Sequence, residues 1–521
     1  MTDHVELRTG VYVDSVGLMQ VSRQVAATPG VQAAQVAMAT ELNVDVLTGM
    51  GFTVPAGAGP NDLVVALRAD EEEHLAAGLA AVEAAFAALR PSEQGAGGGR
   101  ESSVVGRPPA PRTLGRAVDA VGANLALVSV PGRFAVVEAF DAVDRGASVV
   151  VFSDNVPVED EVRLKDAAAA RDVLVMGPDC GTAVVGGVAL GFANVVARGP
   201  VGIVAASGTG AQQVMALLDA AGVGTSHCLG VGGRDLSSAV AGRSTRQALA
   251  ALDADPATEC VLVVSKPPAL EVLADLEAYA AGLGTPVHWA TLGPGRPDLT
   301  MAVEALLTAT GRDVPAWPQW APVGPRAGTG DREAHIGRAS RRGRHLRGLF
   351  CGGTLADEAM LVATGELGGI RSNIPLSPDL ALGADLAADG HAVIDFGDDA
   401  LTRGRAHPMI DPSLRLERIA TEAADPSCGV LLLDLVLGHG AHPDPGPELA
   451  AAVGGARATA AGAGRDLPVV VSLTGTRGDP QGLARTAEAL AAAGAAVHLS
   501  NAAATRAALD LLAARTGEEQ S

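Results

Sequence analysis

A turn rich in glycine and hydroxyl groups is the first feature of this sequence that could do chemistry. Residues 201–214 read VGIVAASGTGAQQV, in which Ser207, Gly208, Thr209 and Gly210 separate an apolar run from a helix-like stretch. The first backbone N–H groups of a helix have no partner within the helix and can bind an anion such as phosphate. The same turn is also typical of a plain helix cap that packs closely. The residues therefore indicate either an anion site or a cap.

Lysine is the second notable residue, because only Lys165 and Lys266 occur in the chain. The other strong cations are arginines, a bias that GC-rich codon use explains together with the excess of alanine and glycine. Lys266 directly follows the apolar run CVLVVS. An ammonium at the end of a buried strand can hold a phosphate as a point charge, although a surface lysine at a strand end is the alternative.

Polar residues that follow the other apolar runs are further candidates for ligand contacts. Ligands of open α/β sheets bind beyond the carboxyl ends of the strands. On this ground we select Asn155, Asp179, Gly181 and Thr182 as weaker candidates for substrate binding. The turns 351–354 and 397–399 also follow such runs.

The cysteines and histidines suggest little chemistry of their own. Cys180 and Cys351 could be nucleophiles, but neither has a base nearby in the sequence, and inert buried cysteine is the commoner case. His439 and His442 have a three-residue spacing, yet they lack the other members of a recognised ligand set, so we predict no metal site. The five cysteines form no C-x-x-C motif, which favours a reducing cytoplasm.

Composition restricts the class of protein and of partner. The formal charge of −21 argues against nucleic acid and anionic membranes as partners. No apolar stretch approaches the roughly 18 residues that a membrane helix needs, and the start MTDHVELRTG lacks the pattern of a secretory signal. We therefore expect a cytoplasmic protein, and 521 residues favour several domains.

Hydrophobic periodicity divides the chain into domains and linkers. Strand-like and helix-like pieces alternate at the start, which suggests a small ferredoxin-like α+β domain. Near-continuous apolar runs then alternate with helices, as in doubly wound α/β domains with parallel sheets. The segments are 1–90 (ferredoxin-like), 91–112 (linker), 113–197 (Rossmann-like), 198–310 (flavodoxin-like), 311–345 (linker) and 346–515 (second flavodoxin-like domain).

Several of these turns, in their order, resemble a known family. The strings VSVPGRFAVVEAFDAVDRG, VLVMGPDCGT, GIVAASGTGAQQV and CLGVGGRDLSSAV resemble the α subunit of succinyl-CoA synthetase. DFGDDALTRG, GVLLLDLVLGHGAHPD and LPVVVSLTGTRGDP resemble the last domain of its β subunit. Both halves on one chain, with an N-terminal extension and the strings VVSKPP and RGRAHPMIDP, resemble the FdrA family.

The resemblance implies an anion site between two helix N-termini, one from each half. Their counterparts are Ser207–Gly210 and the turn of Gly438, His439 and Gly440. The phosphohistidine loop of the synthetase corresponds to TPVHWATLGPGRPDL, in which His288 falls inside a strand. Lys266 stands where the synthetase has a glutamate. The CoA-binding turn is replaced by SSVVGRPPAPR and no ATP-grasp domain is present, so we assign no cofactor.

The FdrA resemblance implies a component of oxamate carbamoyltransferase in allantoin and purine breakdown, with companion subunits. That enzyme converts oxalurate and phosphate to oxamate and carbamoyl phosphate. Ser207–Gly210 and Gly438–Gly440 would then hold phosphate beside Lys266. Arg405 and His407 could bind the carboxylate end or protonate a leaving group, or else cap a loop.

Two other functions remain open from the sequence. One is an acyl-CoA synthetase similar to succinate–CoA ligase, and the other is a non-catalytic regulatory subunit. In each case we expect an oligomer that acts on a small phosphorylated or carboxylate substrate.

Overall fold

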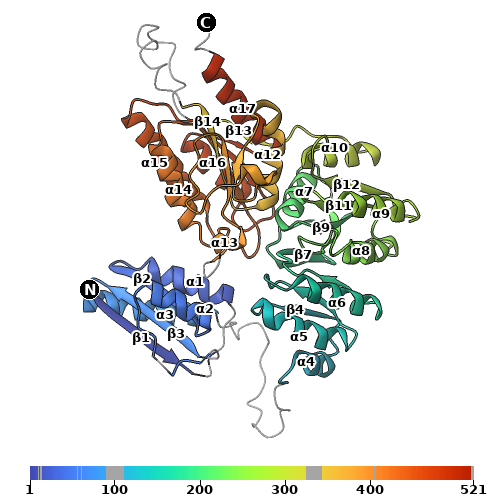
Figure 1. Cartoon of the computed structure of the whole chain (residues 1–521), viewed down its shortest axis with the longest axis horizontal. Helices are drawn as coiled ribbons and strands as arrows, with labels where there is room; N and C mark the ends of the chain where they lie inside the picture. The colour runs from blue at the N-terminus through green and yellow to red at the C-terminus, as the bar shows by residue number, and fades with distance from the viewer. Residues whose placement is uncertain are drawn as a thin grey trace, which may run out of the picture. The chain divides into compact units, whose positions relative to one another are not determined.

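The computed structural model describes residues 1–9, 11, 15–55, 57–59, 62–89, 111–323, 343–402 and 406–517. These residues belong to two compact units (Figure 1). The first unit comprises Met1–Ala110 and Asp399–Asp411, and the second comprises Pro111–Asp398 and Pro412–Ser521. Each unit is described by itself below.

The first unit contains a small α+β domain built on a three-stranded antiparallel sheet of order β1-β3-β2. Leu63, Val65 and Leu67 of the central strand pack with α1 and α3, whereas Val64 and Ala66 pack with α2 on the other face. This alternation is what a strand with two covered faces requires. The elements are β1 (Thr2–Arg8), α1 (Ser15–Ala26), β2 (Val31–Met38), α2 (Glu41–Gly49), β3 (Leu63–Ala69) and α3 (Glu72–Leu89). The sequence did not predict α2.

The second unit begins with a Rossmann-like block, a three-stranded parallel sheet of order β4-β5-β6. Its core consists of small and branched apolar side chains from the strands and from the helices that connect them. The elements are α4 (Leu114–Val121), β4 (Leu125–Val128), α5 (Gly132–Val143), β5 (Ser148–Val151), α6 (Val158–Ala169) and β6 (Val175–Met176).

A six-stranded sheet of order β12-β11-β9-β10-β7-β8 follows. Strands β9 to β12 are parallel, and every residue of β9 and β11 is buried, as expected of strands covered on both faces. The antiparallel hairpin of β7 (Thr182–Val185) and β8 (Val188–Gly191) was not predicted. The remaining elements are β9 (Val201–Ala206), α7 (Gly208–Ala220), β10 (Thr225–Gly230), α8 (Arg243–Asp253), β11 (Cys260–Ser265), α9 (Leu270–Ala280), β12 (Val287–Thr291) and α10 (Leu299–Ala309).

The last block is a seven-stranded sheet of order β13-β19-β18-β17-β14-β16-β15, parallel except for β13. Strand β13 (Gln319–Trp320) lies in the stretch predicted as a linker and pairs with β19. The other strands are β14 (His345–Phe350), β15 (Arg371–Ser372), β16 (Ala392–Asp395), β17 (Cys428–Val436), β18 (Val469–Thr474) and β19 (Ala495–His498). The helices are α12 (Gly353–Leu367), α14 (Ser413–Ala424), α15 (Gly446–Gly462), α16 (Leu483–Ala492) and α17 (Asn501–Gly517), with the short η2 (Pro378–Leu380) and α13 (Asp399–Thr402).

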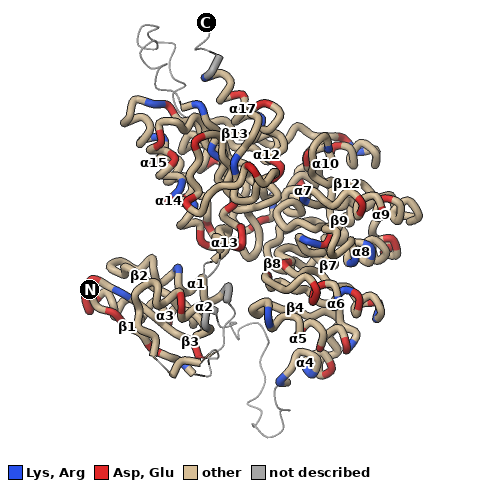
Figure 2. The backbone as a smooth tube through the Cα atoms, in the orientation of Figure 1, with Lys and Arg blue, Asp and Glu red and all other residues tan. Residues whose placement is uncertain are grey.

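The structure confirms the predicted class: parallel α/β sheets preceded by a small α+β domain. Acidic and basic residues are interspersed along the helices of the α/β blocks (Figure 2). Among the described residues, no helix combines the length and the hydrophobicity needed to cross a bilayer.

Candidate functional site

Two helices from different sheets begin side by side in the second unit. Helix α7 follows β9, and α12 follows β14. Ser207 caps α7: its Oγ accepts a hydrogen bond from the Gly210 N–H at 2.9 Å. The same Oγ lies 2.6 Å from Oγ1 of Thr354, in the first turn of α12. A hydrogen bond between two buried hydroxyls therefore joins the starts of the two helices.

Glycines permit this close approach. A methyl group on Gly352 would lie 2.7 Å from Oγ1 of Thr209, and one on Gly210 would lie 3.1 Å from Cγ2 of Thr354. The N–H groups of Gly208 and Thr209 in α7, and of Gly353 and Thr354 in α12, donate to none of the described residues. The two helices therefore present free N–H groups and the positive ends of two dipoles at one place.

Lys266 lies at the same place. A methyl group on Gly353 would lie 2.9 Å from the Lys266 Nζ and 2.8 Å from Oδ2 of Asp395, so both groups face the first residue of α12. Within the described part of the chain, the half-buried Lys266 ammonium makes no hydrogen bond and no ion pair within 4 Å. An unpaired ammonium beside two helix N-termini is suited to an anionic ligand.

Two buried carboxyl groups complete the site. Burial raises the pKa of Asp395, at the end of β16, to about 7, and Lys266 partly offsets this rise. Burial likewise raises the pKa of Asp357, on α12, to about 6, again against the influence of Lys266. The carboxyl groups of the site can therefore change protonation state near neutral pH.

Hydrogen bonds to Asp434 of β17 fix the loop that leads into α12. The Cys351 N–H donates to Oδ1 of Asp434 at 2.8 Å, and the Arg415 Nη1 donates to the same oxygen at 2.6 Å. Burial raises the pKa of the Cys351 thiol far above its usual range and that of Cys180 to about 12. Both thiols are buried, and their raised pKa values agree with the prediction that they are inert.

The second predicted turn does not begin a helix, as the resemblance implied it would. Gly438, His439 and Gly440 do not open a helix, because α15 begins only at Gly446. The Gly438 N–H donates to the Gln481 side chain at 3.1 Å, and the His439 N–H donates to the Ala193 carbonyl at 2.8 Å. The helix N-terminus that faces Ser207 is instead that of α12, and it comes from the turn 351–354.

The weaker candidates are distributed over two places. Thr182 is buried at the start of β7, and its Oγ1 would lie 3.3 Å from a methyl group on Gly208, so it borders the site, whereas Gly181 faces Phe192. Asn155 is exposed and packs against Gly132 at the start of α5. Asp179 is also exposed, and its Oδ2 faces Gly233.

Of the proposed acid and carboxylate-binding pair, Arg405 lies outside the described residues. His407 belongs to the first unit, where its Nδ1 accepts a hydrogen bond from the Met409 N–H at 3.2 Å. This contact is of the kind that orders a loop.

The sequence reading missed Asp357 and Asp395 as site residues. The turns 351–354 and 397–399 follow apolar runs, but no local signal in the sequence connects them to Ser207. These residues come together only because of how the two sheets pack against each other.

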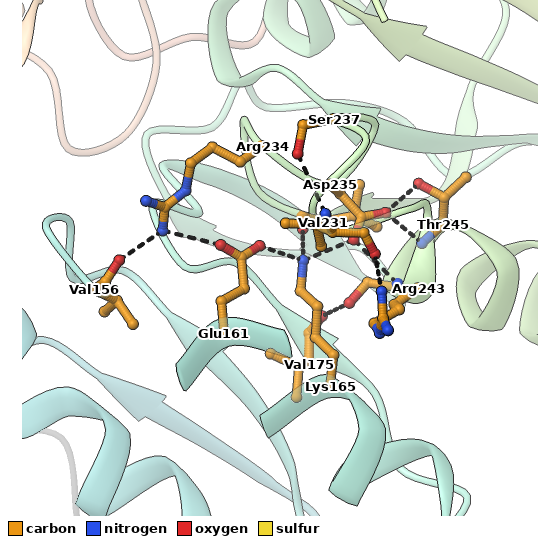
Figure 3. Close-up of polar contacts among 12 residues, drawn as sticks. Val156, Glu161, Lys165, Val175, Val231, Arg234, Asp235, Ser237, Arg243 and Thr245 are labelled. Atoms are coloured by element: carbon orange, nitrogen blue, oxygen red, sulfur yellow. Dashed lines mark hydrogen bonds and ion pairs between the residues drawn. The ribbon is translucent and has the colours of Figure 1, made fainter. Parts of the chain in front are cut away.

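Lys165, the other lysine, lies in a separate buried network (Figure 3). Its Nζ donates to Glu161 Oε1 and to Asp235 Oδ1, each at 2.7 Å, and to the Val231 carbonyl at 3.0 Å. Arg234 pairs with the other oxygen of Glu161 at 2.9 Å. Because Glu161 and Lys165 come from α6 and Asp235 from the loop after β10, the network joins the Rossmann-like block to the next sheet.

Comparison with known proteins agrees with this architecture. Residues 1–103 match the model described as "AllF, heavy metal-associated domain", and residues 349–511 match the CoA-ligase model. Residues 1–103 contain no cysteine, and among the described residues no group of three or more His, Cys, Asp or Glu side chains is arranged to hold a metal ion.

Individual relatives extend the match along the chain. The α subunit of the ADP-forming succinate–CoA ligase of Aquifex aeolicus is 31% identical over 160 residues, 30% of this chain and 51% of that subunit. The ATP citrate lyase structure from Methanothrix soehngenii has a TM-score of 0.32 and 15% identity, over 44% of this chain and 46% of that one. The uncharacterized protein YahF of Escherichia coli strain K12 is 36% identical over 509 residues, 95% of each chain. The chain therefore belongs to the FdrA family of succinyl-CoA synthetase-like proteins.

Proposed function

We propose that this chain is a carbamoyltransferase subunit that binds phosphate, or the phosphate of carbamoyl phosphate, without a covalent bond between α7 and α12. The observation that carries the proposal is the Lys266 ammonium, which has no partner among the described residues and faces Gly353 at the start of α12. The ammonium and the free N–H groups of two helices supply positive charge where a phosphate would lie.

No histidine follows β12 directly, which supports the proposal that the phosphate belongs to a diffusible ligand and not to a phosphohistidine. Residues 292–298, which follow β12, read LGPGRPD. His288 belongs to β12 itself, and burial lowers its pKa. A phosphohistidine enzyme needs an accessible imidazole opposite the helix N-termini, and this loop does not supply one.

The proposed reaction is the reversible conversion of oxalurate and phosphate to oxamate and carbamoyl phosphate. A phosphate oxygen attacks the ureido carbonyl carbon, the C–N bond to the oxamate nitrogen breaks, and that nitrogen takes up a proton. The helix N–H groups and Lys266 would orient the phosphate and stabilise charge on its oxygens.

The proposal includes companion subunits and a cytoplasmic setting. The ligase relatives that the chain matches are named as α subunits, and it spans only about half of their length. All five cysteines are free, as is usual in a reducing compartment.

The direct test supplies carbamoyl phosphate and oxamate to the full chain, alone and with the proteins that co-purify with it. The expected result is a ureido product and an equal amount of phosphate, both reduced in Lys266→Met. Turnover that does not change in this variant would place the chemistry in a companion and make this chain regulatory.

A second candidate, an acyl-CoA ligase, is favoured by the CoA-ligase match over residues 349–511 and by the ligase relatives. It predicts hydrolysis of ATP that depends on CoA and a carboxylic acid. Such hydrolysis, together with no ureido product under any condition, would contradict the carbamoyltransferase proposal and support the ligase.

A further inference from the structure

A phosphate ligand alone does not explain why two carboxyl groups lie beside Lys266. Asp395 and Asp357 are only 4% and 8% exposed, and Lys266 is the cation that acts on both. If both ionise, the three groups carry a net charge of −1, which repels a phosphate dianion. A ligand that suits the whole site must therefore offer hydrogen-bond donors to the carboxyl groups as well as acceptors to the helices.

Asp395 is fixed by hydrogen bonds, and one of its carboxyl oxygens has no hydrogen-bond donor among the described residues. Its backbone N–H donates to Oδ1 of Asn373 at 2.9 Å, and its carbonyl accepts from the Asn373 Nδ2 at 2.8 Å. Its Oδ1 accepts from the Gly397 N–H at 2.9 Å. Its Oδ2 accepts no hydrogen bond from a described residue and points to Gly353, where Lys266 also points.

Asp357 lies one turn further along α12 than Gly353. Its carboxyl group makes no hydrogen bond within the described chain, although the residue is more than nine-tenths buried. A carboxyl group with little access to water and no protein donor is poorly solvated, so a bound N–H group would stabilise it.

We infer that Asp395 Oδ2, supported by Asp357, accepts a hydrogen bond from the amino group of the ligand, and that the site thereby selects carbamoyl phosphate over acyl phosphates. This inference rests on the proposed function. Carbamoyl phosphate has an NH2 group where acetyl phosphate has a methyl group, and the two molecules are otherwise nearly the same size. A methyl group would leave Asp395 Oδ2 buried without a donor.

The preference should be measurable as a ratio of affinities. A hydrogen bond to a charged group contributes about 1.5–3 kcal/mol, which corresponds to about 10-fold to 100-fold in affinity. Both compounds share the phosphate, so contacts with α7, α12 and Lys266 cancel in the ratio.

The experiment measures how carbamoyl phosphate and acetyl phosphate displace radiolabelled inorganic phosphate from the full chain, in the cold to limit hydrolysis. We expect carbamoyl phosphate to compete at a concentration at least about 10-fold lower. In Asp395→Ala the ratio should fall to about one, because the acceptor is gone. Asp275→Ala, on α9 with a side chain that is 65% exposed, is the matched control and should keep the parent ratio.

The outcomes separate this inference from the proposed function. Failure of all three phosphate compounds to bind would overturn the proposed anion site itself. Equal competition by the two compounds in the parent chain would overturn the inference and leave the anion site standing, as would an unchanged preference in Asp395→Ala. If Asp395→Ala does not fold, Asp395→Leu replaces it, because leucine fills the space and offers no acceptor.

Discussion

At the residue scale, the two lysines differ in their surroundings, and the proposed anion site depends on this difference. Lys165 is fully buried and bound by two carboxylates, whereas Lys266 has no hydrogen-bonding or ion-pair partner within the described chain. Paired buried charges hold a structure together, and an unpaired ammonium at two helix N-termini is available to a ligand. Lys266 is therefore the residue whose loss should affect binding more than stability.

Lys266→Met should weaken phosphate binding about 10-fold to 100-fold, because a charge-assisted contact contributes roughly 1.5–3 kcal/mol. Equilibrium dialysis with labelled phosphate measures this loss. Lys266→Arg keeps the charge and should recover part of the affinity. Arg246→Met, on the exposed surface of α8, is the control and should bind as the parent does. Full affinity in Lys266→Met would remove this lysine from the site.

Asp395 should also make stability depend on pH. Its pKa is raised from 3.8 to about 7, so the folded chain keeps a proton that the unfolded chain loses over that interval. Rising pH therefore lowers the stability of the parent across this window. Asp395→Asn removes the part of this dependence that Asp395 contributes, whereas Asp357 keeps its own. The free energy of unfolding of Asp395→Asn relative to the parent should rise by about 2–4 kcal/mol between pH 4 and pH 8. Denaturation of the ligand-free proteins at several pH values measures the gain, and a constant difference would contradict the raised pKa.

At the element scale, the site consists of two helix starts brought together by glycines. Gly353 and Gly365 are both on α12, but a methyl group on Gly353 would meet Asp395 and Lys266, whereas one on Gly365 would meet nothing within 4 Å. The pair therefore offers one substitution inside the site and one matched substitution outside it.

Gly353→Ala should reduce phosphate affinity at least about 10-fold, because the methyl group displaces Lys266 and Asp395 from the start of α12. Gly365→Ala should bind normally and be more stable by up to about 1 kcal/mol, because alanine favours a helix. Dialysis and thermal melting of the two variants test both statements. Similar affinity in the two variants would mean that the ligand does not lie beside Gly353.

The elements themselves were largely predictable from the sequence, whereas the partner of the first helix was not. Apolar runs identified β9, β11, β14 and β17, since strands buried on both faces leave that pattern. Ser207 was found because a turn after such a run opens a helix. The expectation that Gly438 opens the helix facing Ser207 was wrong, because packing between two sheets brings the start of α12 to that place. A role of the turn Gly438–Gly440 in phosphate binding stays a prediction. Short strands such as β13, of two residues, leave too little periodicity to detect.

At the scale of the whole molecule, the second unit depends on contacts between its blocks. The Lys165 network connects α6 of the Rossmann-like block with the loop after β10, and its three charged side chains are at most 1% exposed. The block therefore stands in a fixed relation to the sheet that carries α7. Loss of this connection should lower stability without a change in the chemistry of the anion site.

Lys165→Met should cost about 3–5 kcal/mol, because Asp235 would remain buried without a cation and Glu161 would keep only its contact with Arg234. Arg163→Met, also on α6 with a side chain that is 71% exposed, should cost less than about 1 kcal/mol. Thermal melting of the two variants makes the comparison. Equal melting temperatures would show that the buried network contributes no net stability.

We propose that the phosphate bound at this site belongs to a small molecule and not to the enzyme. The most direct test incubates the full chain with carbamoyl phosphate labelled with ³²P, and in parallel with γ-labelled ATP, CoA and succinate. Bound label is counted before and after denaturation. Carbamoyl phosphate should bind saturably, Lys266→Met should weaken this binding, and denaturation should release all of the label. Label from ATP that stays on the denatured chain would contradict this proposal and indicate a phosphorylated enzyme.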